Sequence, residues 1–241
     1  PIVLYIKGEM DFLKFRSLAV VGSRRASFYG LANAENLSFE LGLKGMAIIS
    51  GMARGIDTYA HRGALRAGAI TVAVLGSGLN SIYPSENIRL SNEISLRGAV
   101  ISEFPLNTGP LKYNFPRRNR LISGLSAGVL VVEASLNSGA LITADFALEQ
   151  GREVFALPGP INSNTSIGTN QLIKQGAKLV SCANDILEDF PVEDVSACSE
   201  AFDKAVQKLG IAQEEALLYN LISSTPILMD DILDRTGMNI G

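Results

Sequence analysis

Histidine, cysteine and tryptophan are scarce or missing in this chain, which has one His, two Cys and no Trp in 241 residues. The cysteines, Cys182 and Cys198, form no CxxC pair, so neither a disulfide framework nor a zinc site is indicated. No apolar run approaches the ~20 residues that a membrane helix needs, and the first residues do not form a basic targeting segment. We therefore expect a cytoplasmic protein that uses no metal and no cofactor and enters no membrane.

Net charge is also small, at −3, which by itself argues against a nucleic-acid-binding protein. The charges are, however, unevenly distributed. Residues 104–132 contain no acidic residue and four basic ones, whereas residues 188–203 contain six acidic residues and no basic one. This separation predicts a basic site and an acidic linker in the same chain.

Short apolar runs alternate with amphipathic segments over residues 18–187. Runs such as TVAVL and VLVV are apolar throughout, as expected of buried parallel strands, so the pattern predicts an α/β fold whose mainly parallel sheet is covered by helices on both faces. The expected strands are 18–21, 46–49, 70–75, 99–102, 128–133, 153–157 and 178–180, with a lead-in strand at 2–5. Ligands of such sheets bind at the carboxyl ends of the strands, near a topological switch point, and the glycine-rich turns lie at those ends.

The expected helices are 27–43, 56–66, 85–96, 117–124, 139–150, 169–175 and 184–187, with Ser138 as the N-cap of the fifth. Two long irregular segments, 103–113 and 158–168, interrupt the alternation. Long loops in compact α/β domains are usually functional or mobile, and we expect this of residues 103–113.

Three regions are expected from these patterns: an α/β domain at 1–188, an acidic linker and helix at 189–211, and a small, incomplete helical module at 212–241. In the last two regions, helical patterns at 202–209, 214–223 and 229–236 are consistent with the start of a helix-turn-helix or winged helix. For this module, a role in docking or a vestigial origin is at least as well supported as recognition of DNA.

The turn after the strand at 18–21 contains Gly22, Ser23, Arg24 and Arg25. Backbone N–H groups at the start of the following helix favour anions, and an arginine fork suits phosphate. The turn matches neither GxxxxGK[ST] nor GxGxxG, which disfavours ATP hydrolysis and ordinary dinucleotide binding. A solvated surface turn is the alternative, and the similar turn at residues 50–55 shifts the balance towards phosphate binding.

A second candidate is the segment 112–120, KYNFPRRNR, which interleaves cations with aromatic residues. Single-stranded nucleic acid needs this mixture, because bases stack on aromatic faces and cations follow the phosphates. In the alternative interpretation, Phe115 belongs to the core, Pro116 begins a helix, and the arginines lie on its exposed face.

Asp57 and His61 are spaced i, i+4 on one expected helix, so they can touch. A structural pair is more plausible than an acid–base or metal pair, because no further ligands are suitably spaced. Glu133 ends a strand and could project into the cleft, but it defines no reaction without a partner carboxylate or nucleophile.

At this point the residues resemble a known family. The blocks VVGSRRASFYG, ISGMARGIDTYAH, VLGSGLNSIYP, SEFP, FPRRNRLISGLS, VLVVEA, SGALITADFALEQGREVFALPG and GTNQLIKQGA occur in this order. Through these blocks, the chain resembles the DNA-processing protein A family (DprA, also called Smf) over about residues 1–188. The resemblance implies an extended Rossmann-like domain without catalytic activity that binds single-stranded DNA, homodimerises and loads the recombinase RecA during natural transformation.

The family's DNA-binding positions correspond to Arg24, Lys112, Phe115 and Arg118, and we expect the turn of Gly51 and Arg54 to be a further phosphate contact. Together with their neighbours, the expected DNA-binding residues are Ser23, Arg24, Arg25, Gly51, Arg54, Lys112, Phe115, Arg117, Arg118 and Asn119. The resemblance includes neither the sterile-alpha-motif-like domain that often precedes this core nor a complete winged-helix tail.

The competing function is enzymatic. Related Rossmann-like nucleoside-monophosphate phosphoribohydrolases are marked by PGGxGTxxE. Here LPGP is followed by a longer insert before Gly168-Thr169-Asn170, and Gln171-Leu172-Ile173 follows where the catalytic glutamate is expected. The hydrolase is therefore the second hypothesis, and a partner-docking scaffold that binds no DNA is the third.

Overall fold

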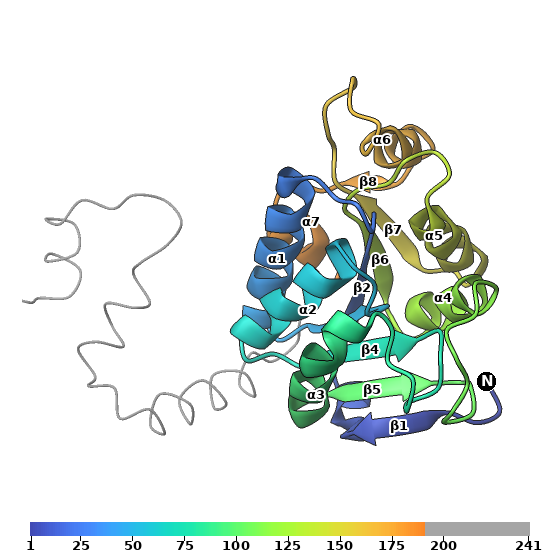
Figure 1. Cartoon of the computed structure of the whole chain (residues 1–241). Coiled ribbons are helices and arrows are strands. Elements are labelled where there is room, and N and C mark those ends of the chain that lie inside the picture. Colours follow the sequence, from blue (N-terminus) through green and yellow to red (C-terminus); the bar gives the residue numbers. More distant parts are fainter. Residues whose placement is uncertain (191–241) are drawn as a thin grey trace, which may run out of the picture. The chain divides into compact units, whose positions relative to one another are not determined.

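An eight-stranded sheet forms the centre of residues 1–190, the part of the chain that this computed structural model describes (Figure 1). The strands are β1 (Tyr5–Gly8), β2 (Ser17–Val21), β3 (Ala47–Ser50), β4 (Thr71–Leu75), β5 (Ala99–Ser102), β6 (Gly128–Val131), β7 (Glu153–Ala156) and β8 (Lys178–Leu179). The helices are α1 (Phe28–Leu43), α2 (Ile56–Arg66), α3 (Ile88–Arg97), α4 (Asn114–Gly124), α5 (Gly139–Glu149), α6 (Ile167–Lys174) and α7 (Ala183–Leu187), with short 3-10 helices at Met10–Lys14 and Ser85–Asn87. This is the α/β fold that the sequence predicts.

The strand order is β1-β5-β4-β3-β2-β6-β7-β8, and every neighbouring pair except β1 with β5 is parallel. From β2 the chain proceeds outward through β3, β4 and β5, and then returns to place β6 on the other side of β2. The switch point therefore lies between β2 and β6. Ligands of doubly wound sheets bind at the carboxyl ends of the strands beside this point.

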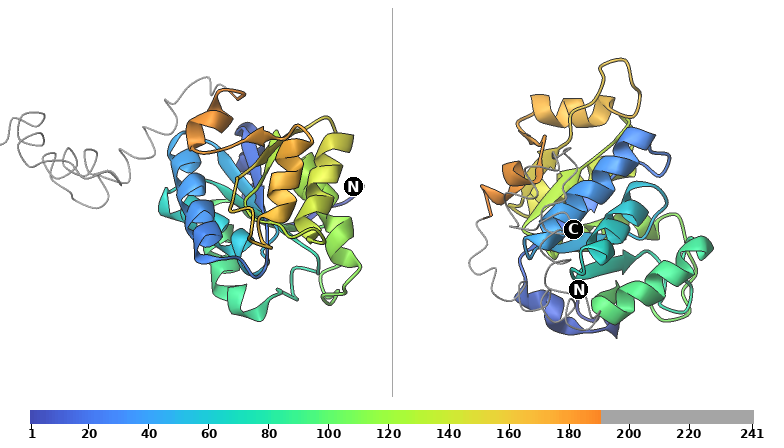
Figure 2. Two further views of the ribbon diagram at one scale, coloured as in Figure 1. Left: turned by 90° about the horizontal axis from the view of Figure 1, so that it is seen from above. Right: turned by 90° about the vertical axis from the view of Figure 1, so that its left-hand side faces the viewer.

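Helices cover both faces of the sheet (Figures 1 and 2), and the side chains of each strand point alternately to the two helical layers. Leu18 and Val20 of β2 pack with residues of α1, α2 and α7, whereas Ala19 and Val21 pack with residues of α4, α5 and α6. Helix α3 covers β4 and β5 on the same face as α1 and α2, through Ala73, Leu75 and Val100. Because both faces are covered, the strands are apolar at nearly every position, which explains their continuous hydrophobic runs.

The first strand differs from its prediction. It occupies Tyr5–Gly8 rather than residues 2–5, and Ile2 is fully exposed. Pairing decides its place, because β1 lies antiparallel to β5 with Tyr5 opposite Ser102 and Gly8 opposite Ala99. At Gly8, where φ is +116°, a Cβ atom would lie 2.2 Å from the carbonyl oxygen of Gly98, so only glycine fits.

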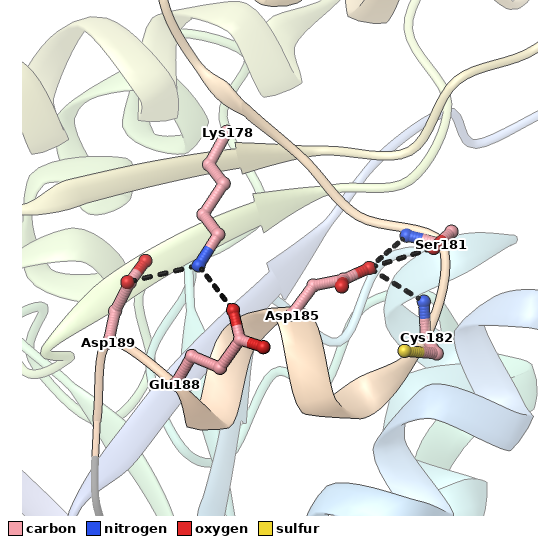
Figure 3. A network of polar contacts seen from close by, with 6 residues as sticks. All are labelled: Lys178, Ser181, Cys182, Asp185, Glu188 and Asp189. Carbon is pink, nitrogen blue, oxygen red and sulfur yellow. Dashed lines mark hydrogen bonds and ion pairs between the residues drawn. The ribbon is translucent and has the colours of Figure 1, made fainter.

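The described part of the chain ends in a polar network around α7 (Figure 3). The Asp185 carboxylate accepts hydrogen bonds from the N–H groups of Ser181 (2.6 Å) and Cys182 (3.0 Å), which lowers the pKa of Asp185. Lys178 of β8 pairs with Glu188 and Asp189 at 3.5 and 3.0 Å. The first two residues of the acidic stretch thus fasten α7 to the sheet.

The helical patterns expected at 202–209, 214–223 and 229–236 lie outside the described residues. So does the expected 212–241 module, together with all but Asp189 and Phe190 of the expected linker. Within residues 1–190, none of the helices combines the length and apolar character that a membrane crossing requires.

Candidate nucleic-acid interface

The loops that follow β2, β3, β4 and β5 meet at one edge of the sheet, because parallel strands place their carboxyl ends together. These loops line two adjoining pockets with volumes of about 210 and 810 Å³. Five residues line both pockets: Arg24, Arg25, Ala53, Tyr83 and Phe115. The cleft is therefore a continuous surface rather than an enclosed cavity for one small ligand.

The large pocket has two chemically different sides. One side, here called the cationic wall, is formed by Arg24 and Arg25 after β2 and Lys112 after β5. The other, here called the hydroxyl wall, consists of uncharged polar residues that follow β6 and β7 or belong to α5: Ser135, Ser138, Thr143, Asn164 and Thr165. Ser138 caps α5 by accepting a hydrogen bond from the N–H of Ala140, as predicted.

Phe115 faces the cleft. Its ring is half-buried, lies 5.7 Å from the ring of Tyr83 with the planes inclined at 51°, and is covered by the Arg24 guanidinium at 5.1 Å. Gly76 makes this position possible, because a Cβ atom there would lie 2.7 Å from the Phe115 ring. The arrangement joins an aromatic surface to a cation, which is the combination that stacked bases and phosphates require.

Arg118 lies beneath this surface and is only 3% exposed. Its Nη1 donates to the carbonyl oxygens of Gly51 (2.6 Å) and Val74, so the guanidinium joins the ends of β3 and β4. The alternative in which the arginines of α4 all lie on an exposed face is therefore wrong for Arg118. It lines the floor of the large pocket, where it adds positive charge from below.

Asp57 is the buried counterpart of this arginine. Burial raises the pKa of Asp57 to about 6 although the charge of Arg118 opposes the rise, and burial lowers the pKa of Arg118 to about 10. Both side chains approach Gly51, where a Cβ atom would lie 2.7 Å from Asp57 Oδ2 and 2.8 Å from Arg118 Nη2. The turn after β3 therefore depends on glycine at position 51.

His61 does not pair with Asp57 as the i, i+4 spacing suggested. Its Nδ1 lies 2.7 Å from Thr71 Oγ1, while Asp57 accepts a hydrogen bond from the N–H of Ala53. Burial first, and then the charge of Arg118, lower the pKa of His61 to about 3. Each residue is structural with its own partner, and within residues 1–190 no group of three His, Cys, Asp or Glu side chains could hold a metal ion.

Arg54 lines the small pocket and is held by an acid. Its guanidinium forms a bidentate ion pair with Glu86, with Nη2 to Oε2 at 2.7 Å. The hydrogen bonds of this pair raise the pKa of Arg54 and lower that of Glu86. Both side chains are more than half exposed, so solvent weakens the pair.

The other expected residues are divided between the cleft and its surroundings. Ser23 and Asn119 line the large pocket; Ser23 Oγ accepts from the N–H of Arg25 at 3.1 Å, and Asn119 donates to the carbonyl oxygen of Gly139 at 3.2 Å. Gly51 lines the small pocket. Arg117 is exposed on α4 and lines neither pocket. Nine of the ten expected residues therefore line the cleft.

Tyr83 and the hydroxyl wall are parts of the cleft that sequence reasoning did not single out. Tyr83 follows the glycine-rich turn after β4, and the position of an aromatic residue in a loop at a strand end is the signal that could have found it. The hydroxyl wall offers no such signal, because serine, threonine and asparagine are ordinary loop residues.

The anion site predicted at the start of α1 is already filled. The carboxylate of Glu133, 2% exposed, accepts a hydrogen bond from the N–H of Ser27 at 2.8 Å. Glu133 therefore does not project into the cleft, as its position after a strand would have allowed, because its side chain turns towards the helix. Arg24 and Arg25 line both pockets, whereas the residues at the start of α1 line neither.

Comparisons with known proteins identify the family of this chain. A family model described as DNA recombination-mediator protein A matches residues 1–191. Protein Smf of Escherichia coli is 54% identical over 191 residues, which cover 79% of this chain and 51% of that protein. DNA processing protein DprA of Streptococcus pneumoniae is 47% identical over 190 residues, covering 79% and 67%. The chain thus spans about half the length of the first relative and two thirds of the second.

Solved structures give the same result. DNA processing protein A from Streptococcus pneumoniae matches with a TM-score of 0.76 at 46% identity, over 79% of this chain and 67% of that one. The protein from Helicobacter pylori, studied for its single-stranded DNA binding mode, matches with a TM-score of 0.71 at 32% identity, over 77% and 85%. A molybdenum cofactor binding protein from Rippkaea orientalis, 19% identical over 72% of this chain and 94% of that one with a TM-score of 0.53, shares only the fold.

Proposed function

This chain belongs to the family of DNA recombination-mediator protein A, and on that premise we propose that its α/β domain binds single-stranded DNA across the carboxyl ends of its strands. The observation that carries the proposal is the Arg24 guanidinium stacked on Phe115 at the junction of the two pockets. One cation and one aromatic face at the same place can hold a phosphate and its neighbouring base together.

Unpaired positive charge supports this proposal. Within residues 1–190, no carboxylate lies within ion-pairing distance of Arg24, Arg25, Lys112 or Arg117. Phosphates of the bound strand would follow Arg24, Arg25 and Lys112, with Arg54 available once Glu86 is displaced. Arg118 would strengthen the field from the floor without leaving its carbonyl partners.

The strand would place a base against Phe115, and Tyr83 extends the aromatic surface at the same junction. Because every base has an aromatic face, such a site tolerates different sequences. The wide, open cleft suits a polymer that enters and leaves at its ends.

We propose that the complete protein protects incoming DNA and passes the bound strand to the recombinase RecA in natural transformation, in the cytoplasm and as a homodimer. Two clefts side by side would lengthen the binding track and raise the avidity without any new contact. A monomeric mass in solution would contradict the dimer, and unchanged RecA loading on adding the protein would contradict the transfer.

We propose further that the cleft binds without catalysing. Of the acids around it, Asp57 and Glu133 are 6% and 2% exposed and have internal hydrogen-bond partners, and Glu86 is held in its ion pair with Arg54. None of the three is free to act as the glutamate of a phosphoribohydrolase. Release of free base from nucleoside monophosphates by the purified protein would revive the enzymatic alternative.

A titration of labelled oligo-dT at several salt concentrations tests DNA binding. For the unmodified protein we expect log affinity to fall with log salt by about 0.7 for each phosphate contacted. Arg24→Ala should weaken binding by roughly tenfold or more and flatten the slope, because it removes both a phosphate partner and the cover of Phe115. Lys112→Ala should flatten the slope with a smaller loss of affinity.

Arg62→Ala is the matched control. Arg62 is an exposed arginine that covers the ring of Tyr59 at 5.1 Å, as Arg24 covers Phe115, but it lines neither pocket. Its removal should leave affinity and slope unchanged. Equal affinities for Arg24→Ala, Lys112→Ala and the unmodified protein would reject the site.

A further inference from the structure

Helix α1 begins where Rossmann-like folds hold a nucleotide phosphate, at the switch point after β2. The start of this helix already has hydrogen-bond partners within the protein. Ser27 is the N-cap, and its Oγ accepts a hydrogen bond from the N–H of Gly30 at 3.2 Å. The N–H of Ser27 itself has a partner from the segment that follows β6.

That partner is the carboxylate of Glu133. Oε2 accepts from the N–H of Ser27 at 2.8 Å, and Oε1 accepts from Ser27 Oγ at 2.6 Å and Thr165 Oγ1 at 3.1 Å. The side chain is buried, and its negative charge lies at the positive end of the helix dipole. Two oxygens, three donors and a helix N-terminus reproduce the environment that a bound phosphate would have.

The surroundings are fitted to this carboxylate. A Cβ atom on Gly30 would lie 2.5 Å from Glu133 Oε2, so no larger residue fits at position 30 beside it. The main chain of Glu133 takes part as well, because its carbonyl oxygen accepts from the N–H of Ser23 at 2.8 Å and would lie 3.0 Å from a Cβ atom on Gly22. One residue therefore closes the anion site and fixes the turn that carries Arg24.

We propose that Glu133 is a specificity-determining residue whose carboxylate occupies the phosphate position of the fold, so that free nucleotides and dinucleotides are rejected. Phosphates can then meet this edge of the sheet only at the arginine side chains in the cleft. A strand with many phosphates gains from several such contacts, whereas a single nucleotide loses its main anchor. The exclusion holds whether or not the cleft binds DNA.

Anion-dependent stability tests the proposal with inorganic phosphate as the probe. The full chain and Glu133→Ala are unfolded by heat in sodium phosphate and in sodium chloride of equal ionic strength, and unfolding is followed by circular dichroism. Phosphate should raise the Tm of Glu133→Ala by about 2 to 4 °C more than it raises that of the unmodified protein, because the anion refills the vacated position. The unmodified protein corrects for the general stabilising effect of phosphate.

Glu133→Gln is the matched variant, since it keeps the volume of the side chain and the position stays filled. It should show no extra gain in phosphate. If Glu133→Ala does not fold in chloride, its refolding yield in the two salts replaces the Tm, and a higher yield in phosphate supports the proposal. Equal responses of Glu133→Ala and the unmodified protein, or an equal gain in Glu133→Gln, would overturn it.

Discussion

The cationic wall and the hydroxyl wall line the same pocket from opposite sides of the switch point. Loops after β2 and β5 supply arginine and lysine to the cationic wall. The hydroxyl wall carries hydroxyl and amide groups and no charge, and it is formed by the loops after β6 and β7 and by α5. Glu133, which follows β6 and could have faced the cleft, directs its carboxylate to the start of α1 instead. In the proposed complex, phosphates would follow the cationic wall, and the hydroxyl wall would contribute shape and weak hydrogen bonds.

Arg118 anchors the floor beneath the cationic wall, and its removal should have the largest effect. Arg118→Met leaves the carbonyl oxygens of Gly51 and Val74 without this donor and Asp57 without its countercharge, which should lower the free energy of unfolding by about 3 to 5 kcal/mol. Urea unfolding measures the loss. Arg117→Met, on the exposed face of the same helix, should change stability by less than ~0.5 kcal/mol.

The loss of unfolding free energy in Arg118→Met should depend on pH, with a defined sign. A carboxyl group whose folded pKa is raised, here from 3.8 to about 6 for Asp57, destabilises the fold progressively as pH rises through this window. Without Arg118 the pKa of Asp57 rises further, so the decline continues to higher pH. The deficit of Arg118→Met should therefore be larger at pH 8 than at pH 5. A deficit independent of pH would mean that Asp57 does not sense this arginine.

Phe115→Leu should have the next largest effect, and on affinity rather than stability. Loss of one stacked base costs about 1 to 3 kcal/mol, so oligo-dT binding should weaken roughly tenfold, while the salt slope stays unchanged because no charge is removed. Tyr59→Leu removes an aromatic ring under an arginine outside the cleft and serves as the control. A changed slope would show that Phe115 acts by holding Arg24 instead of a base.

Glu86→Gln should strengthen DNA binding. It frees Arg54 from its ion pair at the rim of the small pocket, so affinity should rise about threefold at low salt and the slope should steepen by about 0.7. Glu93→Gln, which breaks the exposed pair with Arg89 on α3, is the matched control. An increase of the same size in both variants would reflect net charge alone.

The hydroxyl wall should give the smallest effect. Asn164→Ala should change oligo-dT affinity by less than about twofold and leave the slope unchanged, because no phosphate partner is lost. Asn164→Asp places a negative charge on the same wall and should weaken binding at low salt only, since salt screens the repulsion. A large loss in the alanine variant would show that both walls bind the strand.

Much of the fold follows from local pattern. Seven strands and seven helices lie where the apolar runs and amphipathic segments predict them, and α2 and β5 match to the residue. Helix α4 begins at Asn114, three residues before its expected start at 117, so that Pro116 lies in its first turn. The position of β1 could not be found in this way, since an edge strand is fixed by its partner rather than by its own hydrophobicity.

The candidate site was predictable in its residue types and less so in their roles. Arg24 lies in a basic turn and Arg118 in the basic and aromatic segment 112–120, yet one guanidinium covers an aromatic ring in the cleft and the other is buried among carbonyl oxygens. Local sequence cannot separate them, because the burial of α4 depends on how it packs across β4 and α5.

The sequence alone determined that parallel strands would end at a common edge of the sheet, and that this edge would carry glycine turns, arginines and a segment in which cations alternate with aromatic residues. Composition and periodicity within short windows are sufficient to predict these features. Only the tertiary structure decided that Glu133 fills the start of α1, that Phe115 faces the cleft and that Arg54 is held by Glu86. Each of these contacts joins residues at least 30 positions apart. Such pairings arise from the strand order and the packing of both helical layers, which no local pattern encodes.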